Sequence, residues 1–397
     1  MINPKLDNET KRYFYERCKV LFFLGAPNFW YSDLDMPNFL KKIYFYLSKF
    51  MDAAVILLII LEWFAFWTQN NLNEKQTADL ILFSFSHPVI FSFVLSLYYY
   101  LEDIKVVLYI LTHKLKVFND KEVEREMVKR ANIFSYFYTA LTSMALVFYG
   151  IDGIIQVAFA DGTFVTVITV WPDVNEQGLL PDFVRIINYI VWWIFLFRIT
   201  TVYAFVIPVT VCLSHQYKNL CSYFYHLNDI FKEELTQEEK EKKFLEGVVV
   251  GINLHANTLW IKDETVKIFS IVFSGQILVN ITVLIQLMSQ VISSEHTFGN
   301  ALASLSTTSA MLISTGCIMW TAGDVTVEAS KLATAMFSSG WQNCAGASER
   351  RVRSLLLIAM WQSQRPVIIK CLGIIRVSYE SYVSIVRSSY SVFSVLY

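Results

Sequence analysis

The sequence predicts an all-α integral membrane protein with seven transmembrane helices, a cytoplasmic N-terminus, an extracellular C-terminus and a last helix split into two halves. Two observations support this prediction. Of the 397 residues, 55% are hydrophobic and only 17% are charged, with a mean hydropathy of +0.43. Soluble domains carry nearer 25% charged residues. In addition, Lys and Arg gather in every second connection between long apolar runs.

The charge pattern sets the predicted orientation. Basic residues are dense in the first 42 residues and in ranges 102–130, 214–267 and 323–353. By contrast, 69–79 contains only Lys75, and 159–184 and 292–300 contain no Lys or Arg. Short cytoplasmic loops retain Lys and Arg, whereas short translocated loops exclude them. The N-terminus is therefore expected inside, and seven crossings place the C-terminus outside.

Each predicted span has about 20 largely apolar residues, the length that crosses a bilayer. We expect the spans at 44–68, 79–101, 132–158, 186–213, 266–291, 301–322 and 379–397. The first 43 residues form a cytoplasmic segment, and the whole chain is expected to be one domain. The second span contains His87-Pro88, where a proline removes a backbone donor and favours a kink.

Two further helical segments are expected on the cytoplasmic side. Residues 354–364 are apolar but too short to span, lie beside a basic cluster and end at Arg365-Pro366. This segment is the cytoplasmic half of the split last helix. Apolar residues also recur at helical spacing on both sides of the charged run Lys232–Lys243. That spacing predicts a helix pair turning at the run, and a nucleic-acid tract is disfavoured because the run is as acidic as it is basic.

No catalytic constellation is visible, so we do not expect an enzyme. Phosphate-binding glycine loops are absent, and the six histidines and six cysteines show no metal-ligand spacing. We therefore predict no metal, no cofactor and no nucleic-acid partner. Hydroxyl residues of the sixth span are expected to serve helix packing.

Ionisable residues inside the bilayer are costly and become candidates for function. Arg198 lies near the middle of the fourth span, and an acid or carbonyl on a neighbouring helix is its expected partner. Glu62 and Asp152 are possible acids, although the sequence does not pair them with Arg198. His87 beside Pro88 is expected to be a hydrogen-bonded residue at the kink.

The outer halves of four spans carry aromatics, methionines and a few hydroxyls, a mixture that suits a pocket for a small apolar molecule. The alternative is an ordinary interfacial belt of aromatic residues. The candidate ligand-binding residues are Phe83, His87, Ile90, Met144, Val147, Phe148, Ile151, Tyr189, Trp192, Trp193, Leu196, Ser304, Thr307, Thr308 and Met311.

The C-terminal region carries a family resemblance. The run Gln362-Ser363-Gln364-Arg365-Pro366, followed by a span closing on Ser388–Leu396, resembles the C-terminal signature of insect odorant receptors. The preceding loop, with Glu328–Leu332, Ala335-Met336-Phe337 and Trp341, is also similar. Motif similarity is concentrated in roughly the last 75 residues, and topology and length match over the whole chain.

The resemblance implies a ligand-gated, non-selective cation channel. Its members assemble as a hetero-tetramer of a variable tuning subunit and a shared insect odorant co-receptor, in the plasma membrane of olfactory sensory neurons. A small volatile odorant is then the ligand, and membrane lipid surrounds the spans. Residues 354–364 would be an intracellular anchor helix and 379–397 the pore helix, with Ser388, Ser391, Val392 and Val395 at the pore.

Four other classes of membrane protein fit the sequence less well. The co-receptor has a longer connection than 214–265, so this chain resembles a tuning subunit. Gustatory receptors share the topology but close on a Thr-Tyr pair and Gln-Phe, where this chain has Ser389-Tyr390. A G-protein-coupled receptor has the opposite orientation, an outer disulfide pair and an Asp-Arg-Tyr motif. A secondary transporter is disfavoured by the lack of repeats.

Overall fold

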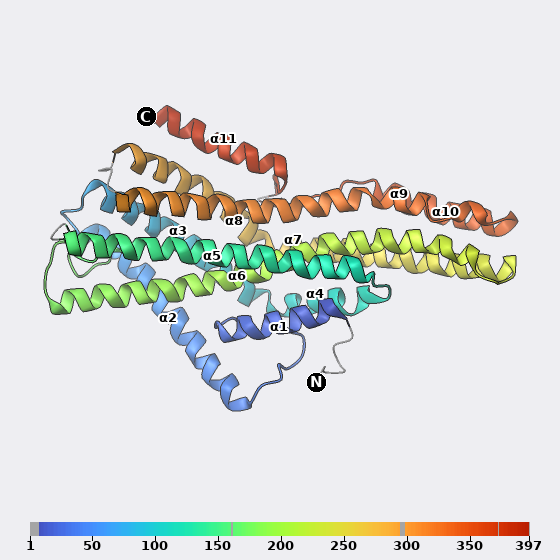
Figure 1. The fold of residues 1–397 in the computed structure, drawn as a ribbon, viewed down its shortest axis with the longest axis horizontal. Helices are drawn as coiled ribbons and strands as arrows, with labels where there is room; N and C mark the ends of the chain where they lie inside the picture. Colours follow the sequence, from blue (N-terminus) through green and yellow to red (C-terminus); the bar gives the residue numbers. More distant parts are fainter. Residues whose placement is uncertain (1–7, 160–161, 294–297, 372, 397) are drawn as a thin grey trace.

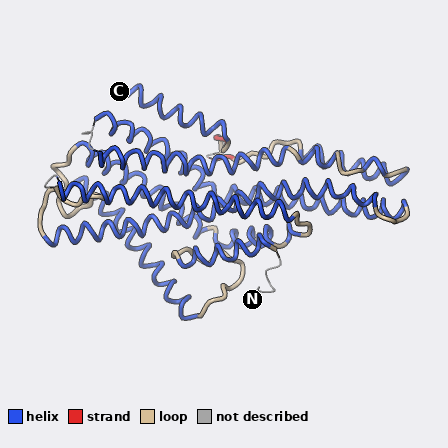
Figure 2. The backbone as a smooth tube through the Cα atoms, in the orientation of Figure 1, coloured by secondary structure: helices blue, strands red, loops and turns tan. Residues whose placement is uncertain are grey.

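The computed structural model describes residues 8–159, 162–293, 298–371 and 373–396, which form an elongated bundle of helices (Figures 1 and 2). The helices are α1 (Glu9–Phe23), α2 (Asn38–Thr68), α3 (Glu74–Tyr99), α4 (Leu101–Thr112), α5 (Lys121–Phe159), α6 (Leu179–Leu227), α7 (Gln237–Ser293), α8 (Phe298–Ser330), α9 (Leu332–Phe337), α10 (Gly346–Ser363) and α11 (Tyr379–Leu396). Short 3₁₀ turns cover Lys114–Lys116, Asn228–Lys232 and Trp341–Asn343.

Six helices of the described ranges are long and apolar enough to cross a membrane, namely α2, α3, α5, α6, α7 and α8. They coincide with the first six predicted spans, although most extend beyond them. The seventh predicted span corresponds to α11, which does not reach the same hydropathy in the described residues. Glu380, Arg387 and several serines lower its hydropathy.

Two helices are much longer than a bilayer requires. At about 1.5 Å per residue, the 49 residues of α6 extend over about 74 Å and the 57 residues of α7 over about 86 Å. The hydrocarbon core is only about 30 Å thick. Both helices therefore project beyond one end of the bundle, where α9 and α10 accompany them (Figure 1). Helices α6 and α7 are the predicted helix pair, and the turn between them lies at the start of the charged run Lys232–Lys243.

Helix α6 runs through the centre of the bundle. From Arg198 to Tyr217 every side chain is buried, which requires neighbours on all sides of this stretch. Contacts with α2, α3, α5, α7 and α8 supply those neighbours. Side chains of α6 can therefore reach the interior of the bundle from several directions.

The N-terminal segment contains a helix that the sequence analysis did not predict. Helix α1 is capped by Asn8, whose side chain accepts a hydrogen bond from the Lys11 amide at 2.7 Å. Its buried face carries Phe14, Cys18 and Leu21. The Thr10 hydroxyl donates to Glu124 of α5 at 2.6 Å. Helix α1 is therefore fixed against α5.

The end of the chain forms two separate helices. Helix α10 contains the predicted segment 354–364 but begins earlier, at Gly346, and ends at Ser363. A small antiparallel hairpin follows, in which β1 (Lys370–Cys371) pairs with β2 (Ile375–Arg376). Helix α11 then turns back along the bundle and packs on α7 and α8 (Figure 1).

Candidate ligand-binding site

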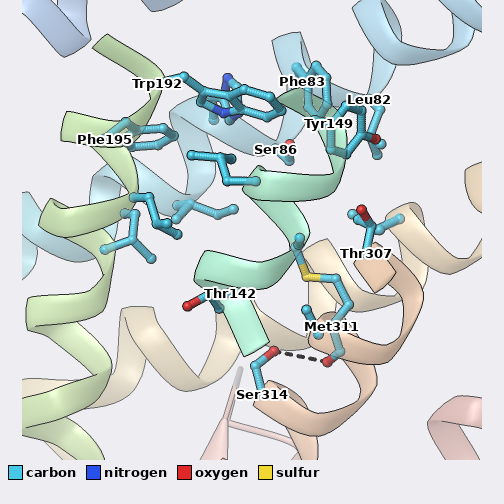
Figure 3. Close-up of a pocket in the computed structure, with 18 of the residues that line it drawn as sticks. Leu82, Phe83, Ser86, Thr142, Tyr149, Trp192, Phe195, Thr307, Met311 and Ser314 are labelled. Atoms are coloured by element: carbon cyan, nitrogen blue, oxygen red, sulfur yellow. Dashed lines mark hydrogen bonds between the residues drawn. The ribbon is translucent and has the colours of Figure 1, made fainter. Parts of the chain in front are cut away.

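A partly open cavity of about 130 Å³ lies among α3, α5, α6, α7 and α8 (Figure 3). An apolar cavity of about 150 Å³ accommodates one benzene molecule. The cavity therefore has room for a ring-sized molecule. Its lining comprises Leu82, Phe83, Ser86, His87, Ile90, Tyr138, Thr142, Ala145, Leu146, Tyr149, Trp192, Phe195, Leu196, Ile199, Tyr203, Gln276, Val283, Thr307, Ala310, Met311 and Ser314.

One end of the cavity is a cluster of aromatic rings. Phe83 stacks on His87, with ring centroids 5.1 Å apart and planes 4° apart. Trp192 meets the edge of Phe83 at 5.0 Å and that of Tyr149 at 5.2 Å, and Phe195 meets His87 at 4.9 Å. Figure 3 places Trp192, Phe195, Phe83 and Tyr149 together at this end. Such edge-to-face contacts fix ring positions and leave apolar faces for a ligand.

His87 is held in one tautomer by partners on two other helices. Its Nδ1–H donates to the fully buried Glu62 carboxylate of α2, at 2.8 and 2.9 Å to the two oxygens. The Trp192 indole, which can only donate, bonds to His87 Nε2 at 3.2 Å. Because Nε2 accepts, the ring proton lies on Nδ1. The chain Glu62–His87–Trp192 thus joins α2, α3 and α6.

Pro88 contributes to the same arrangement. It lies inside α3 and has no N–H, so the Ser84 carbonyl one turn earlier loses its helical donor. The Trp63 indole of α2 donates to that carbonyl at 2.9 Å. The proline therefore creates a further link between α2 and α3, beside His87.

The other end of the cavity is polar. Tyr203 stacks on Tyr138 at 4.3 Å and donates from its hydroxyl to Gln276 Oε1. The Gln276 amide donates to the hydroxyls of Ser314 and Thr315 at 3.0 and 2.9 Å. This network ties α6, α7 and α8 together. It satisfies polar groups that would otherwise be costly inside the membrane.

Seven predicted ligand-binding residues line this cavity: Phe83, His87, Ile90, Trp192, Leu196, Thr307 and Met311. The structure brings them together from α3, α6 and α8. The side chain of Ser304 lies outside the described residues.

The other seven predicted residues do not line this cavity. Met144, Val147 and Ile151 are exposed on the outer face of α5. Tyr189 donates its hydroxyl to the Leu146 carbonyl at 3.0 Å, and Trp193 packs against it at 6.3 Å. Phe148 and Thr308 are partly buried elsewhere on their helices. Apolar residues face lipid as readily as the interior in a membrane, so hydrophobicity does not identify the inner face of α5.

The inner face of α5 carries residues that the sequence analysis missed, namely Tyr138, Thr142, Ala145 and Tyr149. They recur at intervals of four, three and four, which is one helical stripe. The stripe is more polar than the predicted one, and polar groups turn inward in a membrane helix. This polarity is the signal that could have identified it. On α6, Phe195, Ile199 and Tyr203 continue the stripe begun by Trp192.

The intramembrane charges each have a different partner. Arg198 is fully buried and donates to the Asp52 carboxylate at 2.5 Å, to the Tyr98 hydroxyl at 2.9 Å and to the Gly25 carbonyl. Glu62 pairs with His87, and Asp152 pairs with Lys75 at 2.5 Å. Neither possible acid binds Arg198, yet the expected partners, an acid and a carbonyl, are present. Gly25 has φ +89°, and a Cβ there would lie 2.7 Å from Arg198 Nη1.

The predicted pore residues lie on α11. Ser388 and Ser391 are exposed. The side chains of Val392 and Val395 lie outside the described residues. The opposite face of α11 packs on α8, where the Tyr382 hydroxyl donates to the Leu312 carbonyl at 3.2 Å and Ile385 is buried.

The fold and the cavity define a multi-pass helical membrane protein with a partly open, largely apolar pocket that several aromatic rings line. A family model described as 7tm odorant receptor matches residues 80–390, most of the chain. The chain therefore belongs to the 7tm odorant receptor family, as its C-terminal motifs predict, and this is a family of receptors.

Solved structures share the fold. The insect olfactory receptor OR5 from Machilis hrabei in complex with eugenol matches with a TM-score of 0.80 and 11% sequence identity, covering 97% of each chain. A second structure of that receptor matches with a TM-score of 0.79, 11% identity and the same coverage. At this identity the likeness concerns the fold alone. No curated protein sequence matches the chain.

Proposed function

We propose that this chain is the tuning subunit of an odorant-gated, non-selective cation channel and that a small volatile organic molecule binds in the cavity. The main observation behind this proposal is a partly open cavity with aromatic walls in a member of the odorant receptor family. Aromatic faces give shape-tolerant dispersion contacts, and a few polar groups orient the ligand. The related Machilis receptor was determined with eugenol, a small organic molecule, which agrees with this use of the fold.

Helix α8 connects the cavity to the proposed pore helix. Its Met311 and Ser314 line the cavity, and the intervening Leu312 accepts the hydrogen bond from Tyr382 of α11. Trp320, farther along α8, meets the Tyr382 ring at 5.8 Å. A ligand that binds one position of α8 more tightly shifts the equilibrium toward it. Movement of α8 would then carry α11 with it.

A polar clamp holds the start of α11. Asp324 of α8 accepts hydrogen bonds from Arg130 of α5 and from the Tyr379 hydroxyl, the first residue of α11. Gly323 permits the close approach, since a Cβ there would lie 2.9 Å from the Tyr379 ring. This clamp ties the start of α11 to α5 and α8, so displacement of the cavity-lining part of α8 would tilt the rest of α11 about the clamp.

The outward face of α11 suits an aqueous pore. Glu380, Ser384, Arg387 and Ser391 are exposed and recur at intervals of four, three and four, which places them on one helical stripe. A continuous polar stripe is unfavourable against lipid and favourable against water. We propose that this stripe, with Ser388 beside it, faces the pore. Val392 and Val395 remain predictions for the hydrophobic constriction.

Orientation and assembly follow from charge and from exposed apolar surface. The connection at 162–178 contains no Lys or Arg, whereas 214–267, at the projecting end, contains seven. We therefore place the projecting end and the N-terminus in the cytoplasm. There α10 exposes Leu357, Ile358 and Trp361, an apolar surface of the kind that marks a protein interface. We assign it to assembly with the odorant co-receptor in the sensory-neuron plasma membrane.

Recording odorant-evoked current tests this function. Cells expressing the chain together with the odorant co-receptor are expected to pass a cation current within the time of odorant application. Cells with the co-receptor alone should not respond to the same odorant panel. A second-messenger response without any current would instead favour a G-protein-coupled receptor and would refute the channel.

A further inference from the structure

Most polar side chains around the cavity already have hydrogen-bond partners. His87 and Trp192 bond to each other, and Gln276 bonds to Tyr203 and Ser314. The Thr142 hydroxyl donates to the Tyr138 carbonyl at 3.0 Å. Tyr149 and Thr307 bond through their side chains. Buried polar groups are normally paired in this way, so an unpaired one requires an explanation.

Two hydroxyls are the exceptions within the described part of the lining. Ser86 is 3% exposed and Tyr138 is 4% exposed, and neither hydroxyl bonds to any described residue. Figure 3 places Ser86 beside the aromatic cluster of Trp192, Phe83 and Tyr149. Tyr138 belongs to the polar end, stacked on Tyr203. The cavity therefore offers one free hydroxyl toward each of its two ends.

The surrounding polar groups indicate what these hydroxyls require. A hydroxyl can donate and accept. The single lone pair of His87 Nε2 is taken by Trp192, and Gln276 Oε1 accepts from Tyr203 rather than from either free hydroxyl. Ser86 does not donate to its own helix, unlike Ser92 and Ser96 of α3. What is missing is an acceptor, and the bound molecule can supply it.

We propose that Ser86 and Tyr138 select the ligand, and that the preferred ligand is a single-ring volatile compound carrying an oxygen that accepts a hydrogen bond, such as an aromatic aldehyde or ketone. The ring packs within the aromatic cluster, and its oxygen accepts from one of the two hydroxyls. The cavity volume of about 130 Å³ is close to the room that one ring needs. This inference rests on the proposed function in taking the cavity as the odorant site.

Benzaldehyde and styrene form a matched pair of probes, since they have the same shape and differ in C=O against C=CH₂. The purified chain in lipid nanodiscs is titrated with each, and affinity is read from the rise in unfolding temperature. We expect benzaldehyde to bind about fivefold more tightly than styrene, the effect of about 1 kcal/mol for one hydrogen bond. Ser86→Ala or Tyr138→Phe should remove that preference and leave styrene affinity unchanged.

Matched controls exist in the same chain. Ser84 and Tyr217 are also buried with unpaired hydroxyls, but neither lines the cavity. Ser84→Ala and Tyr217→Phe should leave the benzaldehyde preference intact. Three results would overturn the inference. They are equal binding of both probes to the unaltered protein, no binding of either probe, and persistence of the benzaldehyde preference in both Ser86→Ala and Tyr138→Phe. Because binding is measured without current, a channel that fails to open is a separate result.

Discussion

Removing Arg198 should destabilise the bundle far more than removing the ion pair as a whole. Arg198 is fully buried, and the side chain of its partner Asp52 is only 15% exposed. Arg198→Met would leave that carboxylate without its cation, which costs about 3–5 kcal/mol for a buried pair. The Gly25 carbonyl would keep the Ser48 hydroxyl as a donor at 2.5 Å. Most of the lost stability therefore comes from the unpaired charge of Asp52.

A double-mutant cycle measures this effect. The free energy of unfolding in mixed detergent micelles is determined for Arg198→Met, Asp52→Leu and the double variant. Apolar replacement of both partners of a buried pair is often neutral, so the double variant should lie within about 2 kcal/mol of the unaltered protein. Lys105→Met, which breaks an exposed pair with Glu102, should cost about 1 kcal/mol or less. If the double variant loses as much stability as the two single variants together, the reasoning is refuted.

Three other predictions concern topology, acid stability and the pore. An epitope tag at the C-terminus should be stained in unpermeabilised cells and one at the N-terminus should not; the reverse pattern would contradict the orientation. Burial of His255, on the projecting part of α7, lowers its pKa from 6.5 to about 4. Below pH 6.5 the unfolded chain therefore binds a proton at His255, whereas the folded chain binds it only near pH 4. The free energy of unfolding should therefore fall by about 2 kcal/mol from pH 7 to pH 5. The fall should be smaller in His255→Gln, as measured by unfolding at each pH. A water-soluble thiol reagent should block current through Ser391→Cys but not through Ile385→Cys, whose position is buried against α8; equal effects would argue against the pore face.

The fold was largely predictable because its determinants are local. Six spans follow from hydropathy, and the helix pair of α6 and α7 follows from helical spacing on both sides of one charged run. Helices α1 and α4 were missed because they are amphipathic and lie among many charges. Their burial depends on contacts such as Thr10 with Glu124, which join residues far apart in sequence.

The site was half predictable. On α3 and α6, the predicted residues Phe83, His87 and Trp192 line the cavity. On α5 the apolar stripe around Val147 faces outward, because lipid is as apolar as the interior. The partners of Arg198 and Glu62 depend on how helices approach each other in space, which a single sequence does not specify.

The central claim is that ligand in this cavity controls the current, and filling the cavity tests it most directly. Ala145 lines the cavity, whereas Val147, two residues away on α5, is exposed on the outer face. Odorant-evoked current is recorded with the co-receptor for Ala145→Phe and Val147→Phe, with surface expression measured in parallel. Ala145→Phe should abolish the odorant response at normal surface expression, and Val147→Phe should respond as the unaltered chain does. An unchanged response in Ala145→Phe would contradict the claim.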